Sequence, residues 1–383
     1  MSNASSNLVL SSHPGHPATA ARCGARGLRA LLGVACALLA AAGSHAKVID
    51  GPASVPLPAE AVHISNVVTG LKSPWGMAFL PDGRLLVTER AGRLRVVTAR
   101  GRLGAPIKGT PKVDHRDHGG LMDVALDPGF AVNRTIYLSY TEAGSGAKAD
   151  RNGLSVARAR LSLDATRIDE LRVLFQQKPR VQFGEGLGGR VVPTRDGHLY
   201  VTVGDRVLAE TRMRTQSLGH YQGKTLRIRS DGTLPKDNPF VRQRGALPEI
   251  WSLGHRNPGG AFVHPRSGDL WVVGHGPQGG DEINVVRKGL NSGWRVVTYG
   301  CEYITCDAIG EGTGKPGMEP PLTYWGRPSI GPSSMMMYTG NHFPEWRGNL
   351  FIGALAGKAV WPIELGGPAA QPSVVRGEVL LAQ

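Results

Sequence analysis

The chain has 383 residues, enough to bury a large core, and 41% of them are hydrophobic and 19% charged. This balance is typical of folded globular proteins and excludes a chain that is disordered for lack of apolar side chains. The formal net charge of +14 comes from lysines and arginines that are spread along the sequence rather than massed in one block with interleaved aromatic residues. Such a surplus can attract nucleic acid, an anionic surface or an anionic small molecule, but the scattered arrangement argues against nucleic acid, which is not an expected partner.

Residues 1–46 are predicted to be a secretory signal peptide. Three arginines, Arg22, Arg26 and Arg29, precede an apolar run at residues 30–42. The small-residue cleavage motif Ser44-His45-Ala46 follows this run. The apolar run is too short to span a bilayer, so no transmembrane segment is expected after signal removal. The mature protein is therefore expected in the periplasm or outside the cell. It would consist of a lead-in rich in proline and alanine, residues 47–61, and one domain, residues 62–383.

Cleavage after Ala46 removes Cys23 and Cys36 and leaves Cys301 and Cys306 in the mature chain. Export to an oxidising compartment favours a local disulfide between these two, and two free thiols in a loop are the alternative. Sequence alone does not give the Cα separation that a disulfide requires. A zinc site is not expected, because two cysteines stand alone without histidines at zinc-finger spacing.

A short turn followed by an apolar strand recurs five times along the mature chain. The clearest copies are PDGR before LLVT at 81–88, RDGH before LYVT at 195–202 and SGD before LWV at 267–272; weaker copies lie at 133–139 and 347–352. Their spacing of 51 to 80 residues is typical of a β-propeller with insertions, in which loops gather around a central channel. No segment carries a sustained helical period, and residues 156–174 are expected to form strands and turns.

Two polar loops flank the strand expected at residues 269–273. The turn GHRNP, residues 254–258, precedes this strand, and the loop GPQGGDE, residues 276–282, follows it. Polar groups set among glycines and prolines indicate a binding site carried by loops above a β scaffold. Three tryptophans in this region are expected to be core aromatics between blades: Trp251, Trp271 and Trp294.

Eight segments, in the same order, resemble the soluble, secreted PQQ-dependent sugar dehydrogenases, the aldose sugar dehydrogenase branch of the glucose/sorbosone dehydrogenase family. They are SPWGMAFLPDGRLLVTER, GGLMDVALDPGF followed by NRTIYLSYTE, LYVTVGDR, GKTLRIRSDGTLPKDNPF, LGHRNPGG, GPQGGDEIN, PSIGPSS and WRGNLFIGAL. The resemblance implies an all-β fold, a six-bladed β-propeller. It also implies that an aldose is oxidised at its anomeric carbon by hydride transfer to PQQ, with Ca²⁺ as second cofactor and an external electron acceptor.

The cofactor sets the chemistry that the site needs. PQQ is a planar ortho-quinone with three carboxylates, so its site requires cationic and amide donors for the acids and a Lewis acid at the quinone. The resemblance assigns PQQ contacts to Arg256 and Asn257. Lys358 is assigned more weakly, because it lies near but not on the position of the family's lysine. Alternatively, the His-Arg-Asn turn satisfies only strand-end carbonyls.

Calcium takes many oxygen ligands, including backbone carbonyls, and this suits a quinone site. The resemblance assigns two carbonyl ligands to Gly276 and Pro277, and it implies that Asp281 and Glu282 help to organise the ion nearby. The alternative for the adjacent acids is an ordinary solvated turn.

The catalytic base of the family is missing from this sequence. Family members carry a histidine four residues before an arginine, in a motif of the form GHFGSR. Here the segment is EGLGGR, and aligned on Arg190 the histidine position is Gly186. We expect His118 to act as the base instead, since imidazole titrates near neutrality, with Glu185 as the weaker substitute. Alternatively, His115 and His118 are polar loop residues, and catalysis is lost or very slow.

Three residues are expected to contact the sugar: Asp117, Tyr324 and Trp325. Core packing suits the two aromatic residues equally well. Family members continue beyond the strand matched by residues 379–381 into a segment with two closely spaced arginines, whereas this sequence stops at Gln383. The last blade is therefore expected to be incomplete, with unpaired strand edges.

Two other functions remain open. A noncatalytic propeller that binds carbohydrate or protein with the same loops would explain the missing base. A calcium-dependent hydrolase, such as a sugar lactonase, would need several converging side-chain carboxylates, and the acidic motif supplies only one such pair. Fold resemblance alone does not decide among these functions.

Overall fold

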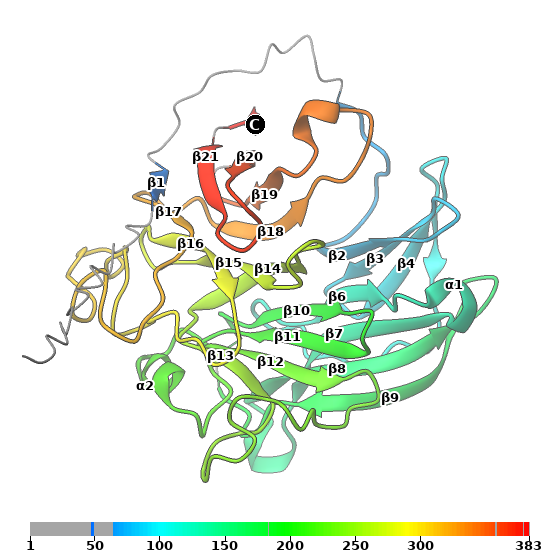
Figure 1. The fold of residues 1–383 in the computed structure, drawn as a ribbon. Coiled ribbons are helices and arrows are strands. Elements are labelled where there is room, and N and C mark those ends of the chain that lie inside the picture. The colour runs from blue at the N-terminus through cyan, green and yellow to red at the C-terminus, as the bar shows by residue number, and fades with distance from the viewer. Residues whose placement is uncertain (1–46, 50–63, 183, 357, 378, 383) are drawn as a thin grey trace, which may run out of the picture. The chain divides into compact units, whose positions relative to one another are not determined.

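A computed structural model of the chain describes residues 47–49, 64–182, 184–356, 358–377 and 379–382. The predicted signal peptide lies outside these residues. Strands organised in five sheets dominate the described part (Figure 1). Helical segments are single turns, as the missing helical periodicity predicts: α1 (Phe130–Asn133), α2 (Ala209–Met213) and the 3₁₀ turns η2 (Gly146–Lys148), η3 (Arg214–Gln216) and η4 (Pro344–Trp346).

The first three sheets are antiparallel and contain four strands each, hydrogen-bonded in chain order. The first contains β2 (Pro74–Phe79), β3 (Leu85–Glu89), β4 (Arg93–Val97) and β5 (Leu103–Pro106). The second contains β6 (Leu121–Leu126), β7 (Thr135–Ala143), β8 (Asn152–Leu161) and β9 (Ile168–Gln176). The third contains β10 (Gly188–Pro193), β11 (His198–Val203), β12 (Lys224–Arg229) and β13 (Ile250–Leu253).

The last two sheets each gain one extra strand. The fourth contains β14 (Asn257–Val263), β15 (Leu270–His275), β16 (Asp281–Val286) and β17 (Thr323–Trp325), and β1 (Lys47–Ile49) pairs in parallel with β17. The fifth contains β18 (Pro332–Met337), β19 (Leu350–Ala354), β20 (Ala359–Gly366) and β21 (Ser373–Gly377), and β22 (Leu381–Ala382) pairs with β20. The predicted lead-in therefore contributes a strand to a sheet.

The five predicted turn-plus-strand units are confirmed as the second strands of the five sheets, β3, β7, β11, β15 and β19. Their turns explain the recurring glycine. Gly83 and Gly197 have φ values of 83° and 80°, a left-handed conformation that glycine adopts without the steric cost that other residues incur. The residues predicted as strands within 156–174 lie in β8 and β9.

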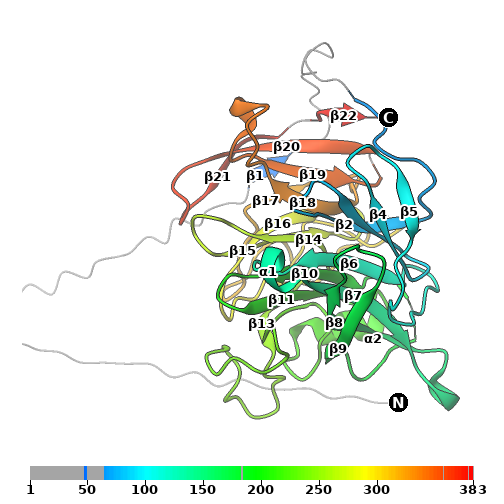
Figure 2. The ribbon, with the colours of Figure 1, turned by 90° about the vertical axis from the view of Figure 1, so that its right-hand side faces the viewer.

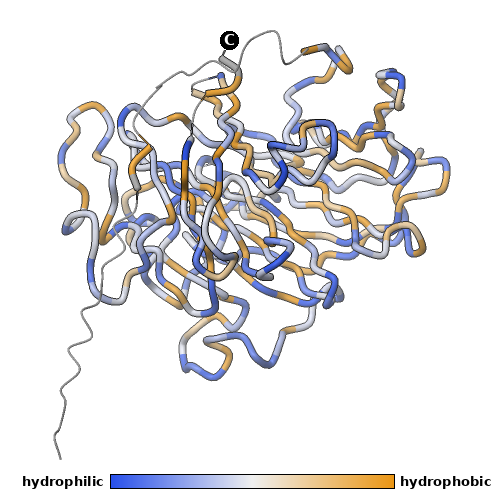
Figure 3. Tube along the Cα trace, turned by 45° about the horizontal axis from the view of Figure 1, so that its top comes forward, coloured by the Kyte–Doolittle hydropathy of each residue, from blue (hydrophilic) through white to orange (hydrophobic). Residues whose placement is uncertain are grey.

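The first strands of successive sheets, β2, β6, β10, β14 and β18, are neighbours in this order (Figure 2). Four buried apolar clusters fill the spaces between consecutive sheets. Figure 3 shows hydrophobic and hydrophilic stretches alternating along the chain, in the extended runs as well as in the loops. Trp271 is buried in the cluster between the fourth and fifth sheets, and Trp251 is partly buried against the cluster between the third and fourth sheets, so the prediction of core aromatics is confirmed for these two. Trp294 is also buried, but it lies in a loop and belongs to none of the four clusters.

The prediction of six blades is wrong for the part of the chain that the structure describes, where the strands form five sheets. The residue pattern itself contains five units, and the sixth blade came from the family resemblance alone. The fifth sheet has its four strands, so none of the described sheets is the expected incomplete blade. No helix among the described residues is long and apolar enough to cross a membrane.

Replacing Trp271 by alanine should lower the free energy of unfolding by about 3–5 kcal/mol, because its fully buried ring lies in the cluster between the fourth and fifth sheets. Phe79→Ala is the matched control. Phe79 is 69% exposed, and its loss should cost about 0.5 kcal/mol or less. Denaturant titration of both variants measures the two values, and equal losses would contradict the assignment of this cluster as core.

Candidate functional site

A cavity of about 580 Å³ opens where the first strands of all five sheets meet. Each of these strands contributes a lining residue: Trp75, Met122, Arg190, Asn257 and Ser333. The loops that precede and follow the strands complete the wall. A site at this position is what a propeller provides, because its inner strands converge while its outer strands diverge.

Arginines dominate the charge of the cavity wall, and Arg190 is held firmly in place. Its guanidinium donates to Asp123 Oδ1 at 3.2 Å, to the Gly259 carbonyl at 2.6 Å and to the Ser333 carbonyl at 3.0 Å. It also lies 4.3 Å from the centre of the Trp75 ring. Arg190 therefore contacts all five sheets, its own included, and most of its donors are already used.

Arg256 lies at the entry to β14 and keeps one donor without a partner. Its Nη1 donates to the carbonyls of Gly276 at 2.5 Å and His275 at 3.2 Å, and its Nη2 donates to the Tyr303 hydroxyl at 2.8 Å. The buried Nε has no hydrogen-bond partner. Next to it, Asn257 Oδ1 accepts the Gly188 N–H at 3.0 Å, which orients the amide.

The structure brings His118 and Glu185 together, with 3.9 Å between His118 Nε2 and Glu185 Oε1. Both line the cavity, and the His118 side chain is 66% exposed. A second imidazole, His275 at the end of β15, lines the same wall. Burial, reinforced by Arg256 and His118, lowers the pKa of His275 to about 4. His275 is therefore neutral at pH 7 and reacts weakly as a base.

The turn at residues 205–207 lies against Gly186, the position that the family resemblance aligns with a histidine. Arg206 and Val207 both have positive φ, 67° and 65°, and their turn lies against Gly186. A Cβ on Gly186 would meet Val207 Cγ2 at 2.9 Å and Asp205 Oδ1 at 3.0 Å. Gly186 itself has a φ of 56°. This backbone therefore has no room for a side chain at position 186.

Asp281 serves as an acceptor for the protein's own backbone and hydroxyl donors. Its Oδ1 accepts the Gly276 N–H at 2.8 Å, its Oδ2 accepts the Ile330 N–H at 2.7 Å, and the Ser329 hydroxyl bonds both oxygens. Its carboxylate therefore shapes the loop that carries Gly276 and Pro277. The alternative of a solvated turn does not describe Asp281, because it is fully buried.

Glu282 points to the other face of β16, where it lines a small enclosed space beside His255, Arg256 and His275. Its Oε2 accepts from Asn284 Nδ2 at 3.1 Å, and burial raises the pKa of Glu282 to about 7. The described residues contain no group of three or more His, Cys, Asp or Glu that could hold a metal ion.

Besides the four residues predicted to bind or organise calcium, four predicted residues lie outside the cavity wall. Lys358 is exposed on the turn between β19 and β20, and Asp117 is exposed in the loop before β6. Trp325 is buried against Trp361, with ring centres 6.0 Å apart, and Tyr324 stacks on Tyr299 at 3.8 Å. For these two aromatic residues the structure favours the alternative of packing.

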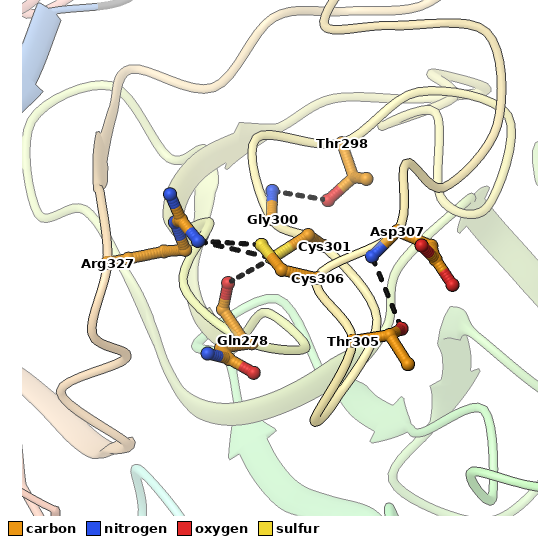
Figure 4. Close-up of a disulfide and its surroundings, with 8 residues drawn as sticks. All are labelled: Gln278, Thr298, Gly300, Cys301, Thr305, Cys306, Asp307 and Arg327. Carbon is orange, nitrogen blue, oxygen red and sulfur yellow. Dashed lines mark hydrogen bonds between the residues drawn. A yellow bond between two sulfur atoms is a disulfide. The ribbon is translucent and has the colours of Figure 1, made fainter.

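Three residues of the site are not among those predicted from the sequence: His275, Asp205 and Tyr303. His275 precedes GPQGGDE directly, and Asp205 belongs to the LYVTVGDR segment, so both could have been found from their neighbours. Tyr303 lies between Cys301 and Cys306, which form a disulfide with a Cα separation of 4.7 Å (Figure 4). The predicted local disulfide is thereby confirmed.

Comparison with known proteins assigns the chain to one family. Residues 71–382 match the glucose / sorbosone dehydrogenase family. The chain is 41% identical over 309 residues to aldose sugar dehydrogenase YliI of Escherichia coli (strain K12), an alignment that covers 80% of this chain and 81% of the relative.

Solved structures of similar proteins support the same family assignment. A crystal structure of a glucose dehydrogenase has a TM-score of 0.77 and 42% identity, with 83% of this chain and 89% of that chain covered. The PQQ-bound form of an aldose sugar dehydrogenase from Streptomyces coelicolor has a TM-score of 0.65 and 26% identity, with 83% and 84% covered.

Gly186→Ala should destabilise the protein more than Gly146→Ala. The two glycines have nearly the same φ, 56° and 55°, but a Cβ on Gly146 would meet nothing within 4 Å. The control should therefore cost only the left-handed backbone penalty, about 1–2 kcal/mol, while Gly186→Ala adds crowding against residues 205–207. Denaturant titration separates the two, and equal losses would show that this turn leaves space for a side chain.

Proposed function

Because the chain belongs to the glucose/sorbosone dehydrogenase family, we propose that it oxidises aldose sugars at the anomeric carbon and uses PQQ as electron acceptor. The observation that carries this proposal is Arg256, whose buried Nε lacks a partner beside a cavity of about 580 Å³. An unpaired buried cationic donor is costly, and an anionic ligand would satisfy it. The relatives named above are sugar dehydrogenases, one of them solved with PQQ bound.

The residues present fit PQQ. Arg256 and the neighbouring Asn257 amide would hold it, since a guanidinium binds carboxylate or quinone oxygens and an amide donates beside it. Arg90 and Arg190 add positive charge to the same wall. When bound, PQQ supplies a two-electron acceptor for the hydride of the sugar.

Calcium fits less well than PQQ. The Gly276 carbonyl, which would be one ligand, accepts from Arg256, and the Asp281 carboxylate is used by backbone and hydroxyl donors. Calcium needs six or more oxygen ligands, so PQQ and water would have to supply most of them. We therefore propose that calcium binds only together with PQQ.

His118 is the proposed proton acceptor. As the anomeric C–H leaves as hydride, the hydroxyl proton passes to His118 Nε2, and the sugar becomes a lactone. Glu185 lies 3.9 Å from that nitrogen and stabilises the resulting imidazolium. Because the His118 side chain is exposed, the proton then leaves to solvent. Neutral His275 contributes shape rather than charge to this wall.

We also propose that the protein works in an oxidising compartment, the periplasm or the outside of the cell, and passes its electrons to an external acceptor. The Cys301–Cys306 disulfide supports this location, because such bonds persist where thiols are not kept reduced.

A noncatalytic sugar-binding propeller is the second candidate. The crowding at Gly186 favours it, because the turn at 205–207 excludes a side chain from the family's base position. The two candidates differ in PQQ affinity and in turnover, and the next two experiments measure these properties.

Titration of the purified protein with PQQ, with calcium and again with chelator, should show saturable binding that is stronger with calcium. Arg256→Ala should weaken binding about tenfold or more, the value of a lost charged hydrogen bond. The control Arg287→Ala removes a partly exposed arginine that pairs with Asp269 and lies outside the cavity wall, and should bind as the unmodified protein does. Absence of PQQ binding by the folded protein would favour the noncatalytic candidate.

His118→Ala should lower kcat for glucose about 100-fold or more while PQQ affinity stays unchanged, because it removes the proton acceptor and no cofactor contact. His115→Ala is the control, since His115 is also exposed but does not line the cavity. Steady-state assays with a dye acceptor measure both variants. Unchanged turnover of His118→Ala would transfer the role of base to another group, with Glu185→Gln as the next variant.

A further inference from the structure

We propose that Tyr303, rather than Tyr324 or Trp325, is the aromatic residue that positions the sugar in the cavity. The inference deepens the proposed function and rests on it, since it concerns the same cavity and the same class of substrate. An aldopyranose presents C–H groups on its ring faces, and these pack favourably on an aromatic ring.

Tyr303 presents an aromatic surface at the cavity. Two of the described lining residues have large apolar side chains that are strongly exposed, Tyr303 at 51% and Leu355 at 67%. The other lining aromatic, Trp75, carries the Arg190 guanidinium 4.3 Å from its ring centre. Within the described wall, the exposed aromatic ring is therefore that of Tyr303.

The loop that carries Tyr303 is tied down on both sides. The Cys301–Cys306 disulfide closes it (Figure 4). The Cys301 and Gln278 backbones exchange hydrogen bonds that link it to the GPQGGDE loop. Glu302, next to Tyr303, accepts from Arg212 at 3.1 Å and from Arg295 at 3.4 Å. A half-exposed ring on so short and cross-linked a loop keeps its place and loses little entropy when a ligand binds.

The ring of Tyr303 lies beside the proposed cofactor contact. Its hydroxyl accepts from Arg256 Nη2 at 2.8 Å, and the ring centre lies 5.7 Å from the guanidinium carbon. A ligand held by Arg256 therefore lies beside the ring of Tyr303. A sugar placed between the two would have its reacting carbon near the cofactor, which is the geometry that hydride transfer needs.

Tyr324 and Trp325 cannot present their rings in the same way. The Trp325 ring packs edge-to-face against Trp361 inside the buried cluster between the fourth and fifth sheets. Tyr324 stacks on Tyr299, with ring centres 3.8 Å apart. Neither lines the cavity.

The experiment compares Tyr303→Ala, Tyr303→Phe and Tyr324→Ala. KM and kcat for glucose are measured with PQQ-loaded protein and a dye acceptor, and glucose binding to PQQ-free protein is measured by saturation-transfer NMR. Tyr303→Ala should raise KM about tenfold with a smaller change in kcat, whereas Tyr303→Phe and Tyr324→Ala should stay close to the unmodified protein. Melting temperatures confirm that each variant is folded.

A disulfide-free variant, Cys301→Ser with Cys306→Ser, tests the loop without removing the ring. It should also raise KM, because Tyr303 is then no longer held in place. An unchanged KM for Tyr303→Ala, or a larger rise for Tyr324→Ala, would overturn the inference. Equal effects of Tyr303→Phe and Tyr303→Ala would overturn it as well, because the hydroxyl rather than the ring would then be responsible.

The NMR measurement separates failure of this inference from failure of the proposed function. If the loaded protein oxidises no aldose, the proposed function fails. Glucose binding that is weakened by Tyr303→Ala would then still support the sugar contact. Absence of glucose binding to the unmodified protein would overturn the inference that Tyr303 contacts the sugar.

Discussion

The site depends on one buried carboxylate, that of Asp205. Its oxygens accept the Val207 N–H and the Trp294 indole N–H, each at 2.9 Å, and its own N–H donates to the Arg256 carbonyl at 2.7 Å. Burial raises the pKa of Asp205, and the nearby charge of Arg256 opposes this effect most strongly. A charge so enclosed is tolerated only while its hydrogen bonds are kept, so three loops are held in one arrangement.

That arrangement determines which groups face the cavity. The turn after Asp205 fills the space beside Gly186, and this excludes a side chain from the position where the family carries its base. In the proposed reaction the base therefore comes from another loop, and the exposed His118 is the imidazole that lies near Glu185.

Arg256 connects the scaffold to the cavity. Its backbone carbonyl is fixed by Asp205, and its guanidinium reaches the carbonyl of Gly276 and the hydroxyl of Tyr303. The same side chain would contact a carboxylated cofactor through its remaining donor. The cofactor contact and the aromatic ring proposed for the sugar are therefore positioned by one guanidinium, and movement of either loop would disturb both.

The sequence by itself determined the strands and the loops that carry chemistry, because alternating apolar residues and glycine turns act over a few neighbours. The five repeats and the pairing of the HRN turn with the GPQGGDE loop follow from such local patterns. The tertiary structure decided the number of sheets, the contact of His118 with Glu185, the structural use of Asp281 and the exposure of Tyr303. These depend on contacts between residues far apart in the chain, such as the packing of Trp325 on Trp361, and no local pattern encodes which aromatic ring is buried and which faces the cavity.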